Sequence, residues 1–196
     1  LINGLVLGSI YALVALGYTM VYGILELINF AHGEVTMFGA MVALAVIGAL
    51  LGVAPDLPGV VVVLGGVLIA VPVCMLLGFG IERLAYRPLR NAPRLAPLIT
   101  AIGLSIVLQN VAMLIWGRQY IAFPPLLPKG THELLGAHIS TLQIFIVALS
   151  VLVMLGLWFT VQKTRLGRAM RATAQSREVA ALMGVNVNGV IAATFV

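Results

Sequence analysis

The sequence predicts an all-α fold, a polytopic bundle of transmembrane helices. Of its 196 residues, 62% are hydrophobic and only 9% are charged, and the mean hydropathy is +1.14. Such a composition leaves too little polar surface to coat a water-soluble globule of this size. The apolar residues also gather in long uncharged runs, which is typical of membrane-spanning helices. We therefore expect a single transmembrane domain over residues 1–196.

Five uncharged, mostly apolar runs account for the expected helices. At about 1.5 Å per residue, each is long enough to cross a hydrocarbon core of roughly 30 Å. A sixth run opens at Val190 and reaches the last residue, and the chain starts without Met. We therefore expect a domain truncated at its C-terminus. The five runs cover residues 1–25, 35–53, 60–81, 95–116 and 139–161.

The basic residues are sorted by loop. Of the eleven, four lie in residues 82–96, two in residues 117–138 and five in residues 162–189. Lys and Arg accumulate in the cytoplasmic loops of membrane proteins. We expect the loops at 82–96 and 162–189 to be cytoplasmic. The net charge of +5 then reflects membrane orientation, so we expect a lipid bilayer around the chain and no nucleic-acid partner.

Residues 26–34, ELINFAHGE, place polar groups between two apolar runs. A charge at membrane depth costs about 2.5 to 3.5 kcal/mol on insertion scales, so it persists where it faces a cavity or water. Broken helices near the midplane can also hold polar substrates through exposed backbone groups. One hypothesis is a broken helix near the first span that lines a translocation path or gate, formed by Asn29, His32, Gly33 and Glu34.

An ordinary turn is the alternative for the same residues. Asn29 would then cap the second helix, His32 would lie in its first turn, and Glu34 would favour the positive end of the helix dipole. The sequence leaves open whether residues 25–34 form a cytoplasmic turn or a break inside the membrane.

A second polar segment covers residues 82–94, ERLAYRPLRNAPR, and is closed by prolines. We interpret this basic connection mainly as an anchor that fixes the topology, with Tyr86 at the membrane interface. Contact with a cytoplasmic partner is the alternative.

The third segment, residues 162–189, has the pattern of two short helices. On the first, Arg165, Arg168, Arg171 and Gln175 share one face, while Leu166, Met170 and Thr173 line another. The second is expected from Arg177 to Met183, with Ser176 as its cap and Gly184 just past its end.

Two interpretations of this third segment compete. A solvated positive loop on the lipid headgroups is one. A plain anchor, however, does not require the small and apolar residues at 178–184 that follow the charges. We therefore favour a cytoplasmic coupling loop over residues 162–189 that docks a soluble partner.

Motifs for nucleotide binding and catalysis are absent from these 196 residues. No Gly-x-x-x-x-Gly-Lys-Ser/Thr occurs, because neither Lys129 nor Lys163 has the required neighbours. Cys74 is the single cysteine, and no nucleophile with a base or metal-ligand spacing is present. We expect a non-enzymatic chain without a metal or cofactor, and ATP, if it drives the process, on another polypeptide.

Taken together, six blocks of sequence resemble the inner-membrane permeases of high-affinity branched-chain amino-acid ABC importers. The resemblance runs along the whole chain, and its most specific block is INFAHGE at 28–34. It implies a permease of the ABC-importer type in the bacterial inner membrane. The other blocks are NGLVLGSIYAL at 3–13, GYTMVYG at 17–23, ERLAYRPLR at 82–90, TRLGRAMRA at 164–172 and ALMGVNV at 181–187.

The resemblance also implies partners and a docking site. It implies cytoplasmic ATPase subunits that hold the ATP, a second permease subunit (sister or self), a periplasmic binding protein and a small amino-acid solute. In such importers a loop with a Glu-x-Ala-x-x-x-Gly core docks in a cleft of the ATPase, although the Ile-x-Leu-Pro that usually follows is not found after Val190. The implied docking residues are Arg165, Gly167, Arg168, Arg171, Arg177, Glu178, Ala180 and Gly184.

Two other functions fit parts of the same pattern. Permeases for urea and short amides are similar at these motifs. An ion-coupled secondary transporter would use Glu26, His32 and Glu34 as a proton or sodium relay. The later apolar runs offer few ionisable groups to continue that relay, which weakens the second alternative.

Overall fold

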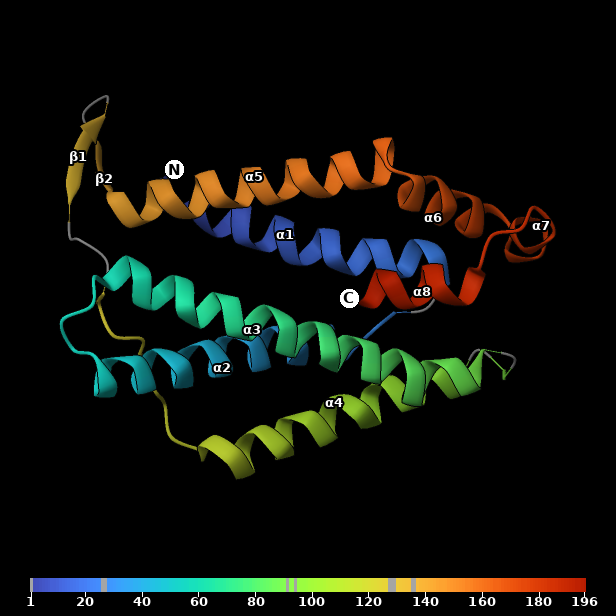
Figure 1. The fold of residues 1–196 in the computed structure, drawn as a ribbon, viewed down its shortest axis with the longest axis horizontal. Coiled ribbons are helices and arrows are strands. Elements are labelled where there is room, and N and C mark those ends of the chain that lie inside the picture. Colours follow the sequence, from blue (N-terminus) through green and yellow to red (C-terminus); the bar gives the residue numbers. More distant parts are fainter. Residues whose placement is uncertain (1, 26–27, 91, 94, 127–129, 135–136) are drawn as a thin grey trace. The chain divides into compact units, whose positions relative to one another are not determined.

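The computed structural model describes residues 2–25, 28–90, 92–93, 95–126, 130–134 and 137–196, with no side chains described for 131–138. Figure 1 shows the order of the elements along the chain. They are α1 (Ile2–Leu25), α2 (His32–Val53), α3 (Gly59–Ile81), the π-helix η1 (Glu82–Tyr86), the 3-10 helix η2 (Arg87–Leu89), α4 (Leu95–Trp116), β1 (Thr131–Leu134), β2 (Ala137–Ser140), α5 (Thr141–Lys163), α6 (Arg165–Gln175), α7 (Arg177–Leu182) and α8 (Val187–Phe195).

Five of the described helices are long and apolar enough to cross a membrane: α1, α2, α3 with its extension to Leu89, α4 and α5. Each begins and ends within about three residues of a predicted run, apart from that extension of α3. The prediction of an all-α polytopic bundle is confirmed. Many large apolar side chains on these helices, such as Leu68, Leu114 and Leu152, are exposed on the chain. Lipid or further protein is the favourable environment for such faces.

The chain divides into two compact units. Unit 1 comprises residues 1–26 and 127–191, and unit 2 comprises residues 27–126 and 192–196, so that the boundary falls within α8. In unit 1, α1 packs along α5, and α6 contacts both helices. In unit 2, α2 packs along α3, and α4 contacts α2 and η1.

Small residues bring α2 and α3 close together in unit 2. A Cβ added to Gly39 would lie 2.8 Å from Cys74 Sγ, and one added to Gly66 would lie 3.0 Å from Ile47 Cγ1. The hydrophobic effect does not drive helices together in lipid. Close approach of the two backbones stabilises the pair through many dispersion contacts instead. A cluster of buried residues in the core of this unit is formed by Ala31, Phe38, Ile81, Tyr86, Ala101, Leu108 and Ala112.

A β-hairpin precedes α5, which the sequence analysis did not predict. Strands β1 and β2 pair antiparallel, with Leu134 opposite Ala137. The helix α5 then starts at Thr141 rather than at the predicted residue 139, because Ser140 forms a capping box with Gln143. Hydropathy alone located the apolar run and could not locate this cap.

Candidate docking element and translocation path

Residues 164–185, which contain α6 and α7, form the candidate docking element of unit 1. Thr164 Oγ1 accepts a hydrogen bond from the Gly167 N–H at 3.1 Å. Ser176 Oγ accepts one from the Val179 N–H at 3.3 Å. Each bond satisfies an N–H that has no acceptor within its helix. The two predicted helices of this segment are confirmed, including the Ser176 cap.

The end of α7 is a Schellman motif. Gly184 has φ +81°, a left-handed conformation that glycine adopts at little cost. Its N–H donates to Ala181 O, and the N–H of Val185 donates to Ala180 O, both at 3.0 Å. Gly184 therefore ends the helix, as predicted.

The basic residues of the docking element have different surroundings. Arg165 and Arg168 are exposed on α6. Arg171, on the same helix, donates from Nη1 to the carbonyl oxygen of Val161 at the end of α5. The predicted shared face therefore contains two arginines open to a partner and one that reaches back to the chain.

Arg177 joins α7 to the end of α1. Its Nη2 donates to Ile24 O at 3.0 Å and to Leu25 O at 2.9 Å. The last carbonyl oxygens of a helix have no N–H donor within the helix, and the helix dipole favours a cation at this end. Arg177 thus donates to the last carbonyl oxygens of α1 and links this helix to the docking element. The bonded residues are more than 150 positions apart in the sequence.

Gly167 sets the contact between α6 and α5. A Cβ at this position would collide with the backbone carbonyls of Thr160 and Val161. The buried face of α6 consists of Gly167, Met170 and Thr173, whereas Leu166, which was expected on that face, is 38% exposed. The missing side chain at Gly167 lets α6 approach the last turn of α5 directly.

A groove of about 610 Å³ lies along α6 and α7. Arg165 and Arg168 contribute basic groups, while Ala172, Val179 and Met183 contribute apolar surface. Glu178 is exposed nearby on α7, and Ala180 lines the groove although it is only 3% exposed. The docking element therefore combines charge with an apolar recess.

In unit 2, Asn29 organises the start of α2. Its side chain is buried, and Oδ1 accepts hydrogen bonds from the Ala31 N–H at 3.1 Å and from Tyr86 Oη at 3.0 Å. The turn interpretation had expected Asn29 to cap α2, but the N-cap of this helix is Ala31. Tyr86 is only 3% exposed, so its expected place as an interfacial anchor is wrong.

Glu34 bonds to the middle of α4. Its Oε1 accepts from Ser105 Oγ at 2.8 Å and from Gln109 Nε2 at 2.7 Å. Ser105 lies halfway along α4, and Gln109 lies one turn further. The first turn of α2 is therefore level with the middle of a candidate membrane span.

In the sequence, His32 and Gly33 lie between Asn29 and Glu34, which make the polar contacts described above. His32 begins α2, and its N–H donates to Asn29 O at 3.1 Å. Gly33 is exposed, and a Cβ there would have no atom within 4 Å. Glu26, the first residue of the suggested ion relay, lies outside the described residues.

A buried ion pair, which was not predicted, lies in the segment expected to be an anchor. Glu82, 2% exposed, forms a salt bridge with Arg90. Glu82, Tyr86 and Arg90 recur every four residues, a helical spacing that indicates a shared face. Ser105 and Gln109 are also four residues apart, within an otherwise apolar run. This spacing was a signal that their shared helix face meets a polar group.

The Asn29–Tyr86 hydrogen bond should contribute measurably to stability. Tyr86→Phe removes one donor from a buried oxygen, which typically costs about 1 kcal/mol. We expect a lower midpoint of thermal denaturation for the detergent-solubilised variant. Tyr120→Phe is the control, because Tyr120 is 96% exposed. Equal midpoints for the two variants would contradict a stabilising role.

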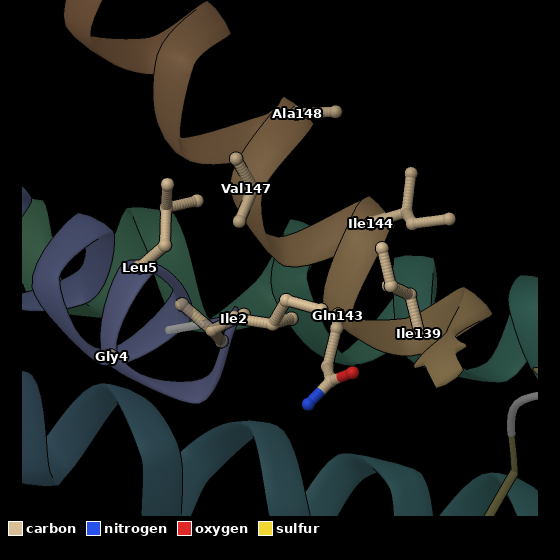
Figure 2. Close-up of a pocket in the computed structure, with 9 residues that line it drawn as sticks. Ile2, Gly4, Leu5, Ile139, Gln143, Ile144, Val147 and Ala148 are labelled. Atoms are coloured by element: carbon tan, nitrogen blue, oxygen red, sulfur yellow. The ribbon is translucent and has the colours of Figure 1, made fainter. Parts of the chain in front are cut away.

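A pocket of about 770 Å³ lies between α1 and α5 in unit 1. Figure 2 shows Ile2 and Leu5 on α1, together with Ile144 and Val147 on α5, around it. Gln143, whose Nε2 donates to Asn3 Oδ1 at 2.8 Å, is its polar lining residue. Its lining offers no charged group to a polar solute, so the polar residues of unit 2 are the better candidate path.

Residues 1–196 match the family model described as the branched-chain amino acid transport system / permease component. The chain belongs to this family. Membership in the branched-chain amino acid permease family agrees with the resemblance found in the sequence. Together with the five candidate spans, it identifies the chain as a multi-pass membrane protein.

Several curated relatives carry the description high-affinity branched-chain amino acid transport system permease protein. BraD of Pseudomonas aeruginosa is 47% identical over 201 residues, and LivH of Escherichia coli K12 is 46% identical over 198. LivH of Salmonella typhimurium is also 46% identical over 198 residues. The alignments cover 100%, 99% and 99% of this chain but 65%, 64% and 64% of the relatives. The chain thus spans slightly less than two thirds of their length. No solved structure matches it.

Proposed function

We propose that the protein is a membrane-spanning permease subunit of an ATP-driven importer. It passes branched-chain amino acids that a periplasmic binding protein delivers, and it lies in the bacterial inner membrane. The chain is not itself an enzyme, since ATP is held by a separate pair of ATPase subunits. The docking element carries this proposal: two capped helices with exposed charge follow directly after an apolar span, in a chain of this family.

The docking element is the surface that meets the ATPase. Arg165, Arg168 and Glu178 are exposed and offer both signs of charge to a partner. The groove beside them supplies apolar area, which a lipid-facing anchor does not need. In this arrangement the basic loops at 82–96 and 162–189 face the cytoplasm.

Force passes from the docking element to two spans. Arg177 bonds to the last turn of α1, and Gly167 and Arg171 hold α6 against the last turn of α5. Closure of the ATPase pair would pull α6 and α7 and thereby tilt α1 and α5 as a body.

The path for the solute follows the start of α2. Glu34 is level with the middle of α4, which favours a break inside the membrane over a cytoplasmic turn. Asn29, His32 and Gly33 precede it and line the path or gate. A second permease subunit, sister or self, completes the pathway against exposed faces of the helices.

Reversal of charge on the docking surface tests the assignment of that surface. In the complete transport system, Arg168→Glu and Glu178→Arg should each lower leucine uptake about tenfold or more, because like charges that face each other at an interface are unfavourable. The amount of protein in the membrane should not change. Arg118→Glu is the control, since Arg118 is exposed in the loop at 117–138 that faces the other side. A fully active double variant would rule out the docking surface.

The energy source separates this proposal from an ion-coupled transporter. Uptake that stops on ATP depletion but persists with an uncoupler supports the importer. Competition at the binding protein between leucine and urea then identifies the class of solute.

A further inference from the structure

Two glutamates of unit 2, Glu34 and Glu82, are held in different ways. Glu82 is buried and neutralised by Arg90. Glu34 is only partly buried, and both hydrogen bonds to it come from the neutral groups of Ser105 and Gln109. Among the residues that the structure describes, Glu34 has no basic side chain within ion-pair distance.

The depth of Glu34 makes this difference important. A carboxylate level with the middle of a span costs about 2.5 to 3.5 kcal/mol when it faces lipid. Such a group is retained where it faces water or a cation. The two neutral donors orient Oε1, and the first turn of α2 favours a negative charge, but none of these groups is a cation. A cation would therefore complete the site.

The surroundings leave room for a small ligand. Gln109 is exposed, and the space beside Gly33 is open. Ile102 and Ile106 are exposed on the same stretch of α4, near Ser105. They add exposed apolar surface to the stretch of α4 that supplies the two donors.

We infer that Glu34, held by Ser105 and Gln109, is a weak binding site for the ammonium group of the amino acid in transit. This inference rests on the proposed function and adds the group of the solute that is recognised. Because Glu34 recognises the ammonium group, which all such solutes share, the site selects charge and leaves the choice of side chain to other parts of the system.

Glu34→Gln tests the inference in the complete system reconstituted in liposomes. The amide oxygen of Gln can accept from both Ser105 and Gln109, so the variant keeps the local hydrogen bonds and loses only the charge. Loss of a charged hydrogen bond corresponds to about tenfold or more, so we expect leucine uptake to fall by that factor. ATP hydrolysis stimulated by the binding protein should stay within about twofold of wild type, since the conformational cycle is intact.

Ser105→Ala is the matched control, because it removes a hydrogen bond and keeps the charge. We expect it to lower uptake less than about threefold. The inference is overturned if Glu34→Gln transports like wild type, if uptake and ATP hydrolysis fall together, or if Ser105→Ala is as damaging. Failure of the wild-type system to import leucine at all would instead contradict the proposed function.

Discussion

Gly167→Ala is expected to abolish most transport, although it adds a single methyl group. The new Cβ would collide with backbone carbonyls at the end of α5, and backbone cannot rotate away as a flexible side chain can. Overpacking of this kind typically costs about 1 to 3 kcal/mol. We expect α6 to separate from α5, with leucine uptake reduced about tenfold or more because the docking element no longer moves with the span.

Gly156→Ala provides the control within the same pair of helices. Gly156 lies inside α5, where an added Cβ meets no atom within 4 Å. Alanine is favoured over glycine in a helix interior by about 1 kcal/mol. Uptake should therefore be unchanged and thermal stability equal or higher. Equal activity of the two alanine variants would refute the close contact at Gly167.

Arg177→Gln is expected to separate ATP hydrolysis from transport. The variant loses the charged donor that serves Ile24 O and Leu25 O, so α1 is released from α7. We expect the ATPase to bind and hydrolyse ATP normally while leucine uptake falls about tenfold, the scale of a lost charge-assisted bond. Uptake and ATP hydrolysis are measured on the same proteoliposomes.

Two further variants show whether Arg177 links the helices or contacts the ATPase. Arg177→Lys keeps the charge but lacks the planar fork that reaches two carbonyls, so partial uptake is expected. Arg165→Gln removes an exposed arginine of the docking surface and should weaken binding of the ATPase itself. Loss of ATPase binding in Arg177→Gln would show that this residue contacts the partner and does not transmit force.

Local signals explain what could be predicted from the sequence. The five spans follow from hydropathy over about twenty residues. The two helices of the docking element follow from Ser176 and Gly184, whose chemistry starts and stops a helix without help from distant residues. The prediction was correct where a short stretch of sequence determines its own conformation.

The remaining features depend on partners far apart in the chain. The bonds from Glu34 to Ser105 and from Asn29 to Tyr86 join residues separated by 71 and 57 positions. Composition could mark these groups as polar residues in an apolar setting, but the pairing depends on how α2, α4 and η1 pack. For the same reason the sequence could not show that Arg177, which was expected at the docking surface, also contacts α1.

The π-helix at Glu82–Tyr86 has a consequence for how the length of this chain can vary. A π-helical turn holds about one residue more than an α-helical turn. Removing the exposed Leu84 should therefore tighten η1 to an α-helical turn and leave the residues that follow close to their present orientation. The same deletion inside α3 should instead rotate all following residues by about 100°. A single deletion should therefore be tolerated better in η1 than in the α-helix before it.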